Sequence, residues 1–256
     1  FGGGTPSYLP ERHIESILNQ INKFFKINKS PEITMECNPN DIYKEKLSQL
    51  LIMGVNRLSI GVQSLDNKLL TTLGRRHSSE EALAALSMAR ETGFNNISLD
   101  FMYGLPTQTL LQWETTLNQI ISVNPDHLSL YCLTLESGTP MEKSVALGNT
   151  PSPDQDLAAD MYIMANSILA PTTYDQYEIS NWSKPGFNSV HNLTYWRNTS
   201  YIGMGPGGHS YIDNKRFNNI KSPREYIKKM SQPDEFINYD KLTTSEIIYK
   251  MATTEN

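Results

Sequence analysis

The chain has little cysteine for its length. Its 256 residues include 2 cysteines, Cys37 and Cys132, and each lies in a short apolar stretch. Sparse cysteine is typical of a protein in a reducing compartment. Because cysteine is among the residue types most often buried, we expect two buried free thiols. Two thiols are too few for an iron–sulfur cluster, which takes about four ligands, mostly cysteine.

A surplus of positive charge and a long apolar run are also missing. The formal net charge is −5, so the chain has no basic excess with which to displace counterions from phosphates, and we expect no binding to nucleic acid. No apolar run approaches the roughly 20 residues that span a bilayer, so we expect no transmembrane segment. No signal peptide is visible either, and we expect a cytoplasmic protein, with a mitochondrial location left open for a eukaryotic relative.

Strand and helix patterns alternate through the first half of the chain. The predicted strands are 32–37, 56–60, 96–103 and 126–133, and the predicted helices are 10–25, 42–53, 65–73, 79–92 and 109–123. We expect the helix over 42–53 to be capped by Asn40 or Asp41 and the helix over 79–92 by Ser78 or Ser79. Such alternation is typical of βαβ units around a parallel sheet and favours a partial barrel.

The alternation stops after residue 135. The pattern there predicts a helix over 154–170, a short strand over 175–180, an irregular stretch over 181–211 and a helix over 223–230. The last residues, 251–256, read as the middle of a helix, so the chain looks cut at both ends. We therefore expect a barrel domain over 1–135 and a smaller α+β region over 136–256.

A polar residue lies within, at the end of or just after each predicted strand. Ligands bind at the carboxyl ends of the strands in such folds, where these residues would share one rim. Each of them alone is readily explained as a cap or turn residue, but together they favour a binding site. The positions are Thr5, Glu36, Gln63, Asp100 and Thr134.

Several motifs carry a family resemblance. The opening Phe1-Gly-Gly-Gly-Thr-Pro-Ser7 resembles the glycine motif of radical S-adenosylmethionine enzymes. Further stretches resemble, in order, the branch that contains oxygen-independent coproporphyrinogen III oxidases and HemW heme chaperones. They are Glu36-Cys-Asn-Pro39, Asn56-Arg-Leu-Ser-Ile-Gly-Val-Gln63, Leu73-Gly-Arg75, Asp100-Phe-Met-Tyr-Gly-Leu-Pro106, Tyr177-Glu-Ile-Ser-Asn-Trp182, His191-Asn-Leu-Thr-Tyr-Trp196 and Gly203-Met-Gly-Pro-Gly-Gly-His-Ser210. The last three are closer to HemW than to the oxidase.

The resemblance implies a partial (β/α)6 barrel of the TIM type and a set of residues that bind S-adenosylmethionine. A bare glycine backbone can approach the methionine end of that ligand closely, and an arginine can pair with a carboxylate in a fork that lysine does not reproduce. The implied residues are Gly3, Gly4, Thr5, Glu36, Gln63, Arg75, Asp100 and Thr134.

The resemblance also implies a 4Fe-4S cluster held by three cysteines in a CxxxCxxC-type loop upstream of the glycine motif. Neither Cys37 nor Cys132 has the spacing to replace that loop. We therefore expect this chain to be an N-terminally truncated fragment that does not itself generate the 5′-deoxyadenosyl radical. Upstream of Phe1 we expect a strand, three closely spaced cysteines and an aromatic residue.

The carboxyl half carries candidate heme residues. The stretch from His191 to Trp196 resembles a heme-contact motif, with His191 as iron ligand and with Tyr195 and Trp196 packing on the porphyrin. His209, in a glycine-rich loop, is a second candidate. A histidine among such residues can equally satisfy buried polar groups. We expect His13, His77 and His127 at the surface or in caps.

Three functions follow from the resemblance. The first is a heme chaperone that binds S-adenosylmethionine and heme and passes heme to membrane hemoproteins. The second is an oxygen-independent oxidase that decarboxylates two propionates of coproporphyrinogen III. The third is an inactive fragment. The stretch His191-Asn-Leu-Thr-Tyr-Trp196 favours the first.

Overall fold

The computed structural model describes residues 1–231 of the chain. Internal contacts divide the chain into two compact units, Phe1–Asn188 and Ser189–Asn256. The division expected after residue 135 rests on the end of the strand–helix alternation there, and it stays a prediction.

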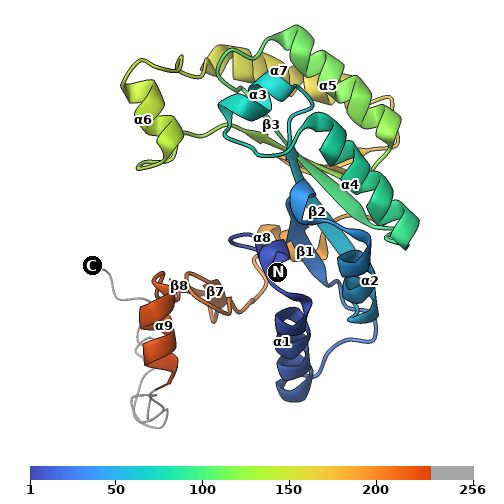
Figure 1. The fold of residues 1–256 in the computed structure, drawn as a ribbon, viewed down its shortest axis with the longest axis vertical. Coiled ribbons are helices and arrows are strands. Elements are labelled where there is room, and N and C mark those ends of the chain that lie inside the picture. Colours follow the sequence, from blue (N-terminus) through green and yellow to red (C-terminus); the bar gives the residue numbers. More distant parts are fainter. Residues whose placement is uncertain (232–256) are drawn as a thin grey trace. The chain divides into compact units, whose positions relative to one another are not determined.

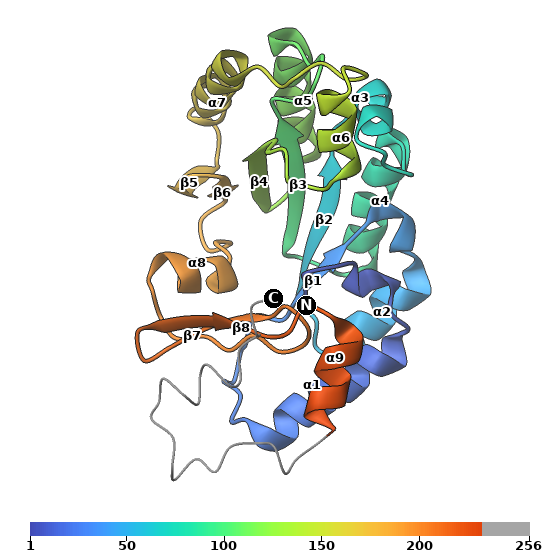
Figure 2. The same cartoon turned by 90° about the vertical axis from the view of Figure 1, so that its left-hand side faces the viewer.

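A six-stranded sheet organises the first unit. Four strands run parallel in the order β1 (Thr34–Cys37), β2 (Arg57–Gln63), β3 (Ile97–Tyr103) and β4 (His127–Cys132). Two short strands then extend the sheet antiparallel, β6 (Asn181–Ser183) beside β4 and β5 (Asp175–Glu178) beside β6. Figure 2 shows the parallel strands side by side. The predicted α/β class with a parallel sheet is confirmed.

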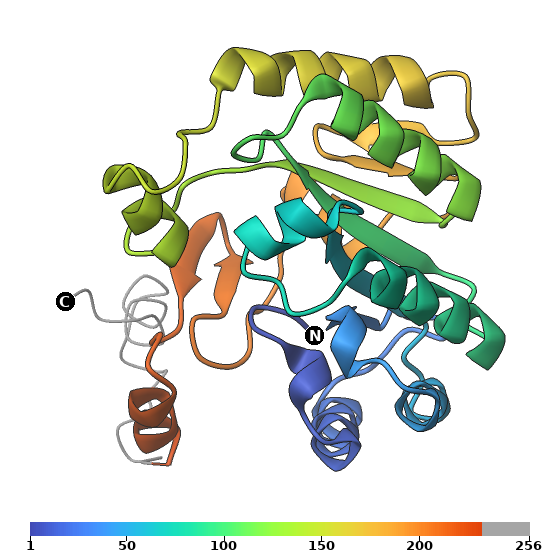
Figure 3. The same ribbon diagram turned by 45° about the horizontal axis from the view of Figure 1, so that its top comes forward.

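Helices connect these strands. They are α1 (Glu11–Phe24), α2 (Lys44–Ile52), α3 (Asn67–Thr72), α4 (Ser79–Thr92), α5 (Leu110–Val123), α6 (Pro140–Ala146) and α7 (Gln155–Leu169), with two 3-10 turns at Pro6–Tyr8 and Pro39–Asp41. Helices α4 and α5 lie along one face of the sheet (Figure 3). The predicted capping residue Ser78 begins α4 in a capping box, and Gly93, with a φ of 113°, ends it.

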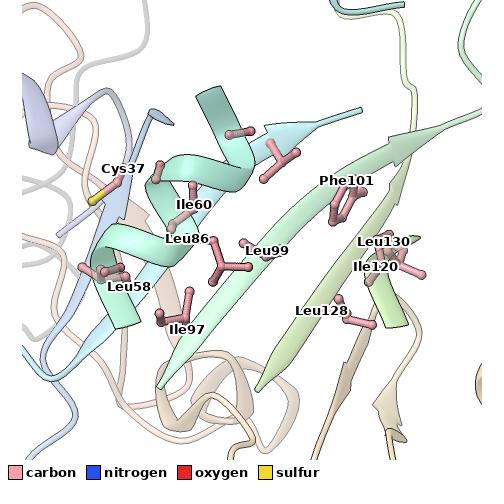
Figure 4. Packing of buried hydrophobic residues seen from close by; sticks show 14 of the residues in the cluster. Cys37, Leu58, Ile60, Leu86, Ile97, Leu99, Phe101, Ile120, Leu128 and Leu130 are labelled. Atoms are coloured by element: carbon pink, nitrogen blue, oxygen red, sulfur yellow. The ribbon is translucent and has the colours of Figure 1, made fainter. Parts of the chain in front are cut away.

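The two faces of the sheet differ because side chains alternate along each strand. Leu58, Ile60, Ile97 and Leu99 point toward the helices and pack with Leu86 of α4 in the hydrophobic core (Figure 4). The residues between them in the sequence are mostly small or polar, and they line the opposite face. This polar face carries the candidate site.

Three sequence predictions are wrong at the level of elements. Helix α2 begins after Tyr43, not after Asn40 or Asp41, and no side chain caps it. The Asp41 carboxylate instead accepts a hydrogen bond from Ser7 Oγ at 2.9 Å, so it is engaged elsewhere. The stretch 181–211, expected to be irregular, contains β6, a helix and the start of a further strand. Helix α6 was not expected at all.

Helix α1 buries Ile14 and Leu18, and Phe24 at its end is exposed. One predicted burial, that of a cysteine, is wrong. Cys37 is a buried free thiol as expected, but Cys132 is only partly buried. The helix predicted over 251–256 lies outside the described residues.

The second unit is a small α+β assembly. It contains α8 (Val190–Trp196), an antiparallel hairpin of β7 (His209–Ile212) and β8 (Lys215–Asn218), and α9 (Pro223–Met230). In Figure 1 the hairpin and α9 follow one another in orange and red. The helix predicted over 223–230 is confirmed.

Candidate functional site

A hollow of about 250 Å³ opens on the polar face of the sheet, at the carboxyl ends of β1 and β2. It brings together most of the residues predicted to bind a ligand. Its lining consists of Gly4, Thr5, Glu36, Cys37, Asn38, Ser59, Gly61, Gln63, Arg75 and Asp100. Six of the eight predicted positions therefore share one hollow, although they come from five separate parts of the sequence.

Gly3, the seventh predicted residue, adjoins the hollow through Glu36. The amide N–H of Gly3 donates to Glu36 Oε2 at 3.3 Å. The neighbouring Gly2 leaves room for this carboxylate, because a Cβ at that position would lie 2.6 Å from Glu36 Oε1. Burial raises the pKa of Glu36, and the Gly3 hydrogen bond opposes that rise. The glycines thus let the backbone close around a carboxylate that faces the hollow.

Arg75 enters the hollow from the turn after α3. Its Nη2 donates to Asn38 Oδ1 at 2.8 Å and to the carbonyl of Gly61 at 3.1 Å. Burial lowers the pKa of Arg75, and the neighbouring Arg76 lowers it further. The guanidinium is therefore fixed by two neutral acceptors rather than by a carboxylate, which leaves its charge available to an anionic group of a ligand.

Asp100 forms the floor of the hollow. Ser59 Oγ donates to both of its carboxylate oxygens, at 3.1 and 2.9 Å, and Ser98 Oγ donates to Oδ1 at 3.1 Å. Burial raises the pKa of Asp100, while hydrogen bonds from serines and the charge of Arg57 oppose that rise. Hydroxyl donors hold this carboxylate in place without neutralising it.

Thr134, the eighth predicted residue, lies elsewhere. It lines a separate hollow after β4, together with Cys132, Leu133, Leu135, Ser152, Pro153 and Gln155. The structure thus does not bring Thr134 together with the other predicted residues.

The cysteine in the main hollow is not suited to metal binding. Burial raises the pKa of Cys37 to about 12, so its thiol stays protonated. Within residues 1–231, no three His, Cys, Asp or Glu side chains form a group that could hold a metal ion. The hollow offers carboxylates, amides, hydroxyls and one guanidinium, which suits a polar ligand carrying both positive and negative groups.

The second unit contains the four candidate heme residues. His191 and Tyr195 lie one turn apart on α8, and their rings pack edge to face with centroids 4.8 Å apart. The Tyr195 hydroxyl lies 3.0 Å from His191 Nε2. Trp196 is 51% exposed. The ring of Tyr195 also packs edge to face on the ring of Tyr201, with centroids 4.6 Å apart. His191 and Tyr195 therefore begin a row of aromatic rings.

The glycine-rich loop before His209 packs against its own backbone. A Cβ on Gly203 would collide with backbone atoms of His209, and the amide of Asn219 donates to the carbonyls of Gly203 and Gly205 at 3.0 and 2.9 Å. These glycines are explained by close approach within the unit. His209 itself is exposed on β7.

Sequence reasoning placed two histidines wrongly. His77 and His127 were expected at the surface or in caps, but they are 6% and 1% exposed. His77 Nε2 lies 2.9 Å from the carbonyl of Val62. His127 lies between Ser98 and Tyr177 on the polar face. Its position in β4, opposite Ser98 in β3, follows from strand register, which the sequence pattern alone does not give.

Comparison with known proteins assigns the fold to a family. Residues 1–120 match the sequence model of the Radical SAM superfamily. Among curated proteins, the heme chaperone HemW of Bacillus subtilis is 40% identical over 90% of this chain. The mouse protein "Radical S-adenosyl methionine domain-containing protein 1, mitochondrial" is 42% identical over 82% of it.

A solved structure is similar as well. The coproporphyrinogen III oxidase HemN of Escherichia coli, described as a radical SAM enzyme, covers 91% of this chain with a TM-score of 0.76 and 27% identity. The chain spans 56% of that enzyme, 61% of the Bacillus protein and 47% of the mouse protein. Among residues 1–231, no helix combines the length and the apolar character that crossing a bilayer requires.

Proposed function

The chain belongs to the radical SAM superfamily, and from this premise we propose that it is part of a heme chaperone that binds S-adenosylmethionine and heme and delivers heme to hemoproteins. The observation that carries the proposal is the 40% identity to HemW over 90% of the chain. We further propose a cytoplasmic location and membrane hemoproteins as acceptors.

The main hollow fits S-adenosylmethionine. Carboxylates at Glu36 and Asp100 are suited to accept hydrogen bonds from the ammonium and hydroxyl groups of the ligand, and Arg75 is suited to its carboxylate. We assign Gly3, Gly4, Thr5 and Gln63 to the same ligand. Thr134 would take part only in a second site. Bound S-adenosylmethionine supplies the radical precursor in this superfamily.

The 4Fe-4S cluster of the superfamily would be held outside the described residues. Cys37 and Cys132 are both free thiols, and burial raises the pKa of each. We propose that three cysteines elsewhere in the complete gene product hold the cluster. This chain contributes the surface that binds and orients S-adenosylmethionine next to it.

Heme binding is assigned to the second unit. We propose His191 as the iron ligand, with Tyr195 and Trp196 against the porphyrin and His209 as the alternative ligand. The contact between the Tyr195 hydroxyl and His191 Nε2 supports this choice, because a hydrogen bond to a ligating histidine orients its ring.

An oxygen-independent coproporphyrinogen III oxidase is the second candidate. The structural similarity to HemN favours it, with a TM-score of 0.76. The lower sequence identity, 27% against 40% for HemW, ranks it behind the chaperone.

Hemin titration of the complete gene product tests the proposal. We expect a shifted Soret band, no consumption of coproporphyrinogen III under reducing conditions with S-adenosylmethionine, and loss of the shifted band in His191→Ala. His13→Ala, at an exposed position of α1, is the control. A His209→Ala variant that alone loses the band would move the ligand to His209, and conversion of coproporphyrinogen III to a vinyl product would favour the oxidase.

A further inference from the structure

A chain of hydrogen bonds runs from Asp100, in the main hollow, through Ser98 and His127 to Tyr177. We propose that His127 is a positioning residue for Asp100: it acts through Ser98, and Tyr177 fixes its tautomer. This inference rests on the proposed role of the hollow in binding S-adenosylmethionine. It concerns residues that do not line the hollow themselves.

The distances define a continuous path. Ser98 Oγ lies 3.1 Å from Asp100 Oδ1 and 2.8 Å from His127 Nδ1. The other ring nitrogen, His127 Nε2, lies 2.7 Å from the Tyr177 hydroxyl. All of these separations are within hydrogen-bond range. The path links β3, β4 and β5 across the polar face of the sheet.

The available protons give this path one direction. Ser98 has a single hydroxyl proton, and it donates that proton to the carboxylate of Asp100. Ser98 must then accept from His127, so Nδ1 carries the ring proton. In a neutral imidazole Nε2 is then an acceptor, and Tyr177 donates to it. The hydroxyl of Ser129 lies 3.4 Å from Ser98 Oγ. Burial raises the pKa of Asp100, and a hydrogen bond from Ser129 opposes that rise, so Ser129 supports the same carboxylate.

The surroundings keep the ring of His127 neutral. The residue is 1% exposed, and burial, followed by the nearby charge of Arg57, lowers its pKa to about 2. Arg57 is itself 4% exposed, and its Nε has no hydrogen-bond partner within residues 1–231. A second positive charge beside it would be unfavourable. Burial and charge therefore both favour the neutral ring that the hydrogen-bond chain requires.

The consequence concerns Asp100. The hydroxyl groups of Ser59, Ser98 and Ser129 face its carboxylate, and the four lone-pair sites of that carboxylate still leave room for a hydroxyl or amine donor of a ligand. If His127 did not donate to Ser98, the Ser98 hydroxyl would be free to turn away, and Asp100 would lose a restraint on its orientation. His127 thus acts on ligand binding without touching the ligand.

The tautomer can be measured without any ligand. In protein labelled with 15N histidine, long-range 1H–15N correlation assigns the proton of each ring, and His127→Asn identifies the His127 signals among the 5 histidines. We expect a neutral ring with the proton on Nδ1 across the neutral pH range, and a changed Nε2 shift in Tyr177→Phe. A proton on Nε2, or a ring that titrates in the neutral range, would overturn the proposal.

Ligand affinity tests the consequence for Asp100. Calorimetric titration of the complete gene product with S-adenosylmethionine would compare His127→Leu, which removes both ring hydrogen bonds, with His127→Asn, which keeps a donor near the position of Nδ1. We expect about a tenfold loss of affinity in the leucine variant, the usual cost of losing one hydrogen bond to a charged group, and recovery to near wild type in the asparagine variant.

The possible outcomes separate the two proposals. If both variants lose the same affinity for S-adenosylmethionine at unchanged melting temperatures, His127 has no positioning role. The same conclusion holds if neither variant loses affinity. If the wild-type protein itself does not bind S-adenosylmethionine, the proposed function fails. The histidine spectrum still reports on the hydrogen-bond chain in that case.

Discussion

The guanidinium of Arg75 and the side-chain amide of Asn38 meet across 2.8 Å and join the turn after α3 to the end of β1. This contact closes one side of the main hollow, which both residues line. The same guanidinium nitrogen also reaches the carbonyl of Gly61 in β2. One side chain therefore ties together three segments that all take part in the proposed ligand site.

Replacing Arg75 with lysine is expected to weaken binding of S-adenosylmethionine by about tenfold or more, because an ammonium does not reproduce the planar fork of donors. Calorimetric titration of the complete gene product measures this change. Arg76→Lys is the matched control, since Arg76 is adjacent and exposed and does not line the main hollow. Equal losses in the two variants would indicate a general effect of charge rather than a specific contact.

Gly61→Ala places a methyl group in the hollow. The new Cβ would lie 2.9 Å from Gln63 Nε2 and 3.4 Å from Arg75 Nη2. The ends of both side chains can move, so we expect an unchanged melting temperature and an affinity for S-adenosylmethionine lower by about tenfold, or about 1.4 kcal/mol. A variant that melts early would instead show that the glycine serves folding, and one that binds normally would place the ligand away from β2.

The sequence predicted the hollow because the carboxyl ends of parallel strands share one edge. Glu36, Gln63 and Asp100 lie in three neighbouring strands, β1, β2 and β3, and they do line one hollow. Thr134, which comes two residues after the end of β4, lines a different hollow. Position after a strand does not determine which way a side chain turns once the strand has ended.

The hydrogen bonds that join Ser98, His127 and Tyr177 could not be predicted from the sequence. His127 carries no local motif, and its partners Ser98 and Tyr177 lie 29 and 50 residues away. Their contact depends on the register of β3 with β4 and on the antiparallel return of β5, which is set by tertiary packing. The missed helices α6 and α8 are each only 7 residues long, too short for a clear period.

Asp126 offers a test of the first unit that does not depend on any ligand. It is 6% exposed, accepts the amide of Ile97 at 2.9 Å and lies 2.6 Å from Arg90 Nη1. Asp126→Asn removes the charge but keeps an acceptor, so we expect a loss of about 2 kcal/mol in the free energy of unfolding, because Arg90 keeps a partly buried charge without its partner. Urea unfolding measures this loss.

The matched control is Asp160→Asn, at an exposed position of α7, which should change the free energy of unfolding by less than about 0.5 kcal/mol. Similar losses in both variants would contradict a specific role for Asp126.

The buried state of His127 predicts how stability depends on pH. The ordinary pKa of histidine, 6.5, applies to the unfolded chain, and the folded value is lowered to about 2. As the pH falls below 6.5, the unfolded state therefore gains a proton that the folded state does not, and stability declines. Glu36 and Asp100, whose folded pKa values are raised, act in the opposite direction, since each favours the folded state as the pH falls.

A comparison of variants separates the effect of His127 on the pH dependence of stability from the effects of Glu36 and Asp100, because these two carboxylates are present in every protein compared. Between about pH 7 and about pH 5, the wild type should lose about 2 kcal/mol more of its unfolding free energy than His127→Asn, which has no proton to gain at this position. The exposed His13 provides the matched control, because His13→Asn should follow the wild type at both pH values. If His127→Asn also loses stability in parallel with the wild type, the ring is not held neutral in the fold, and the direction assigned to its hydrogen bonds is wrong.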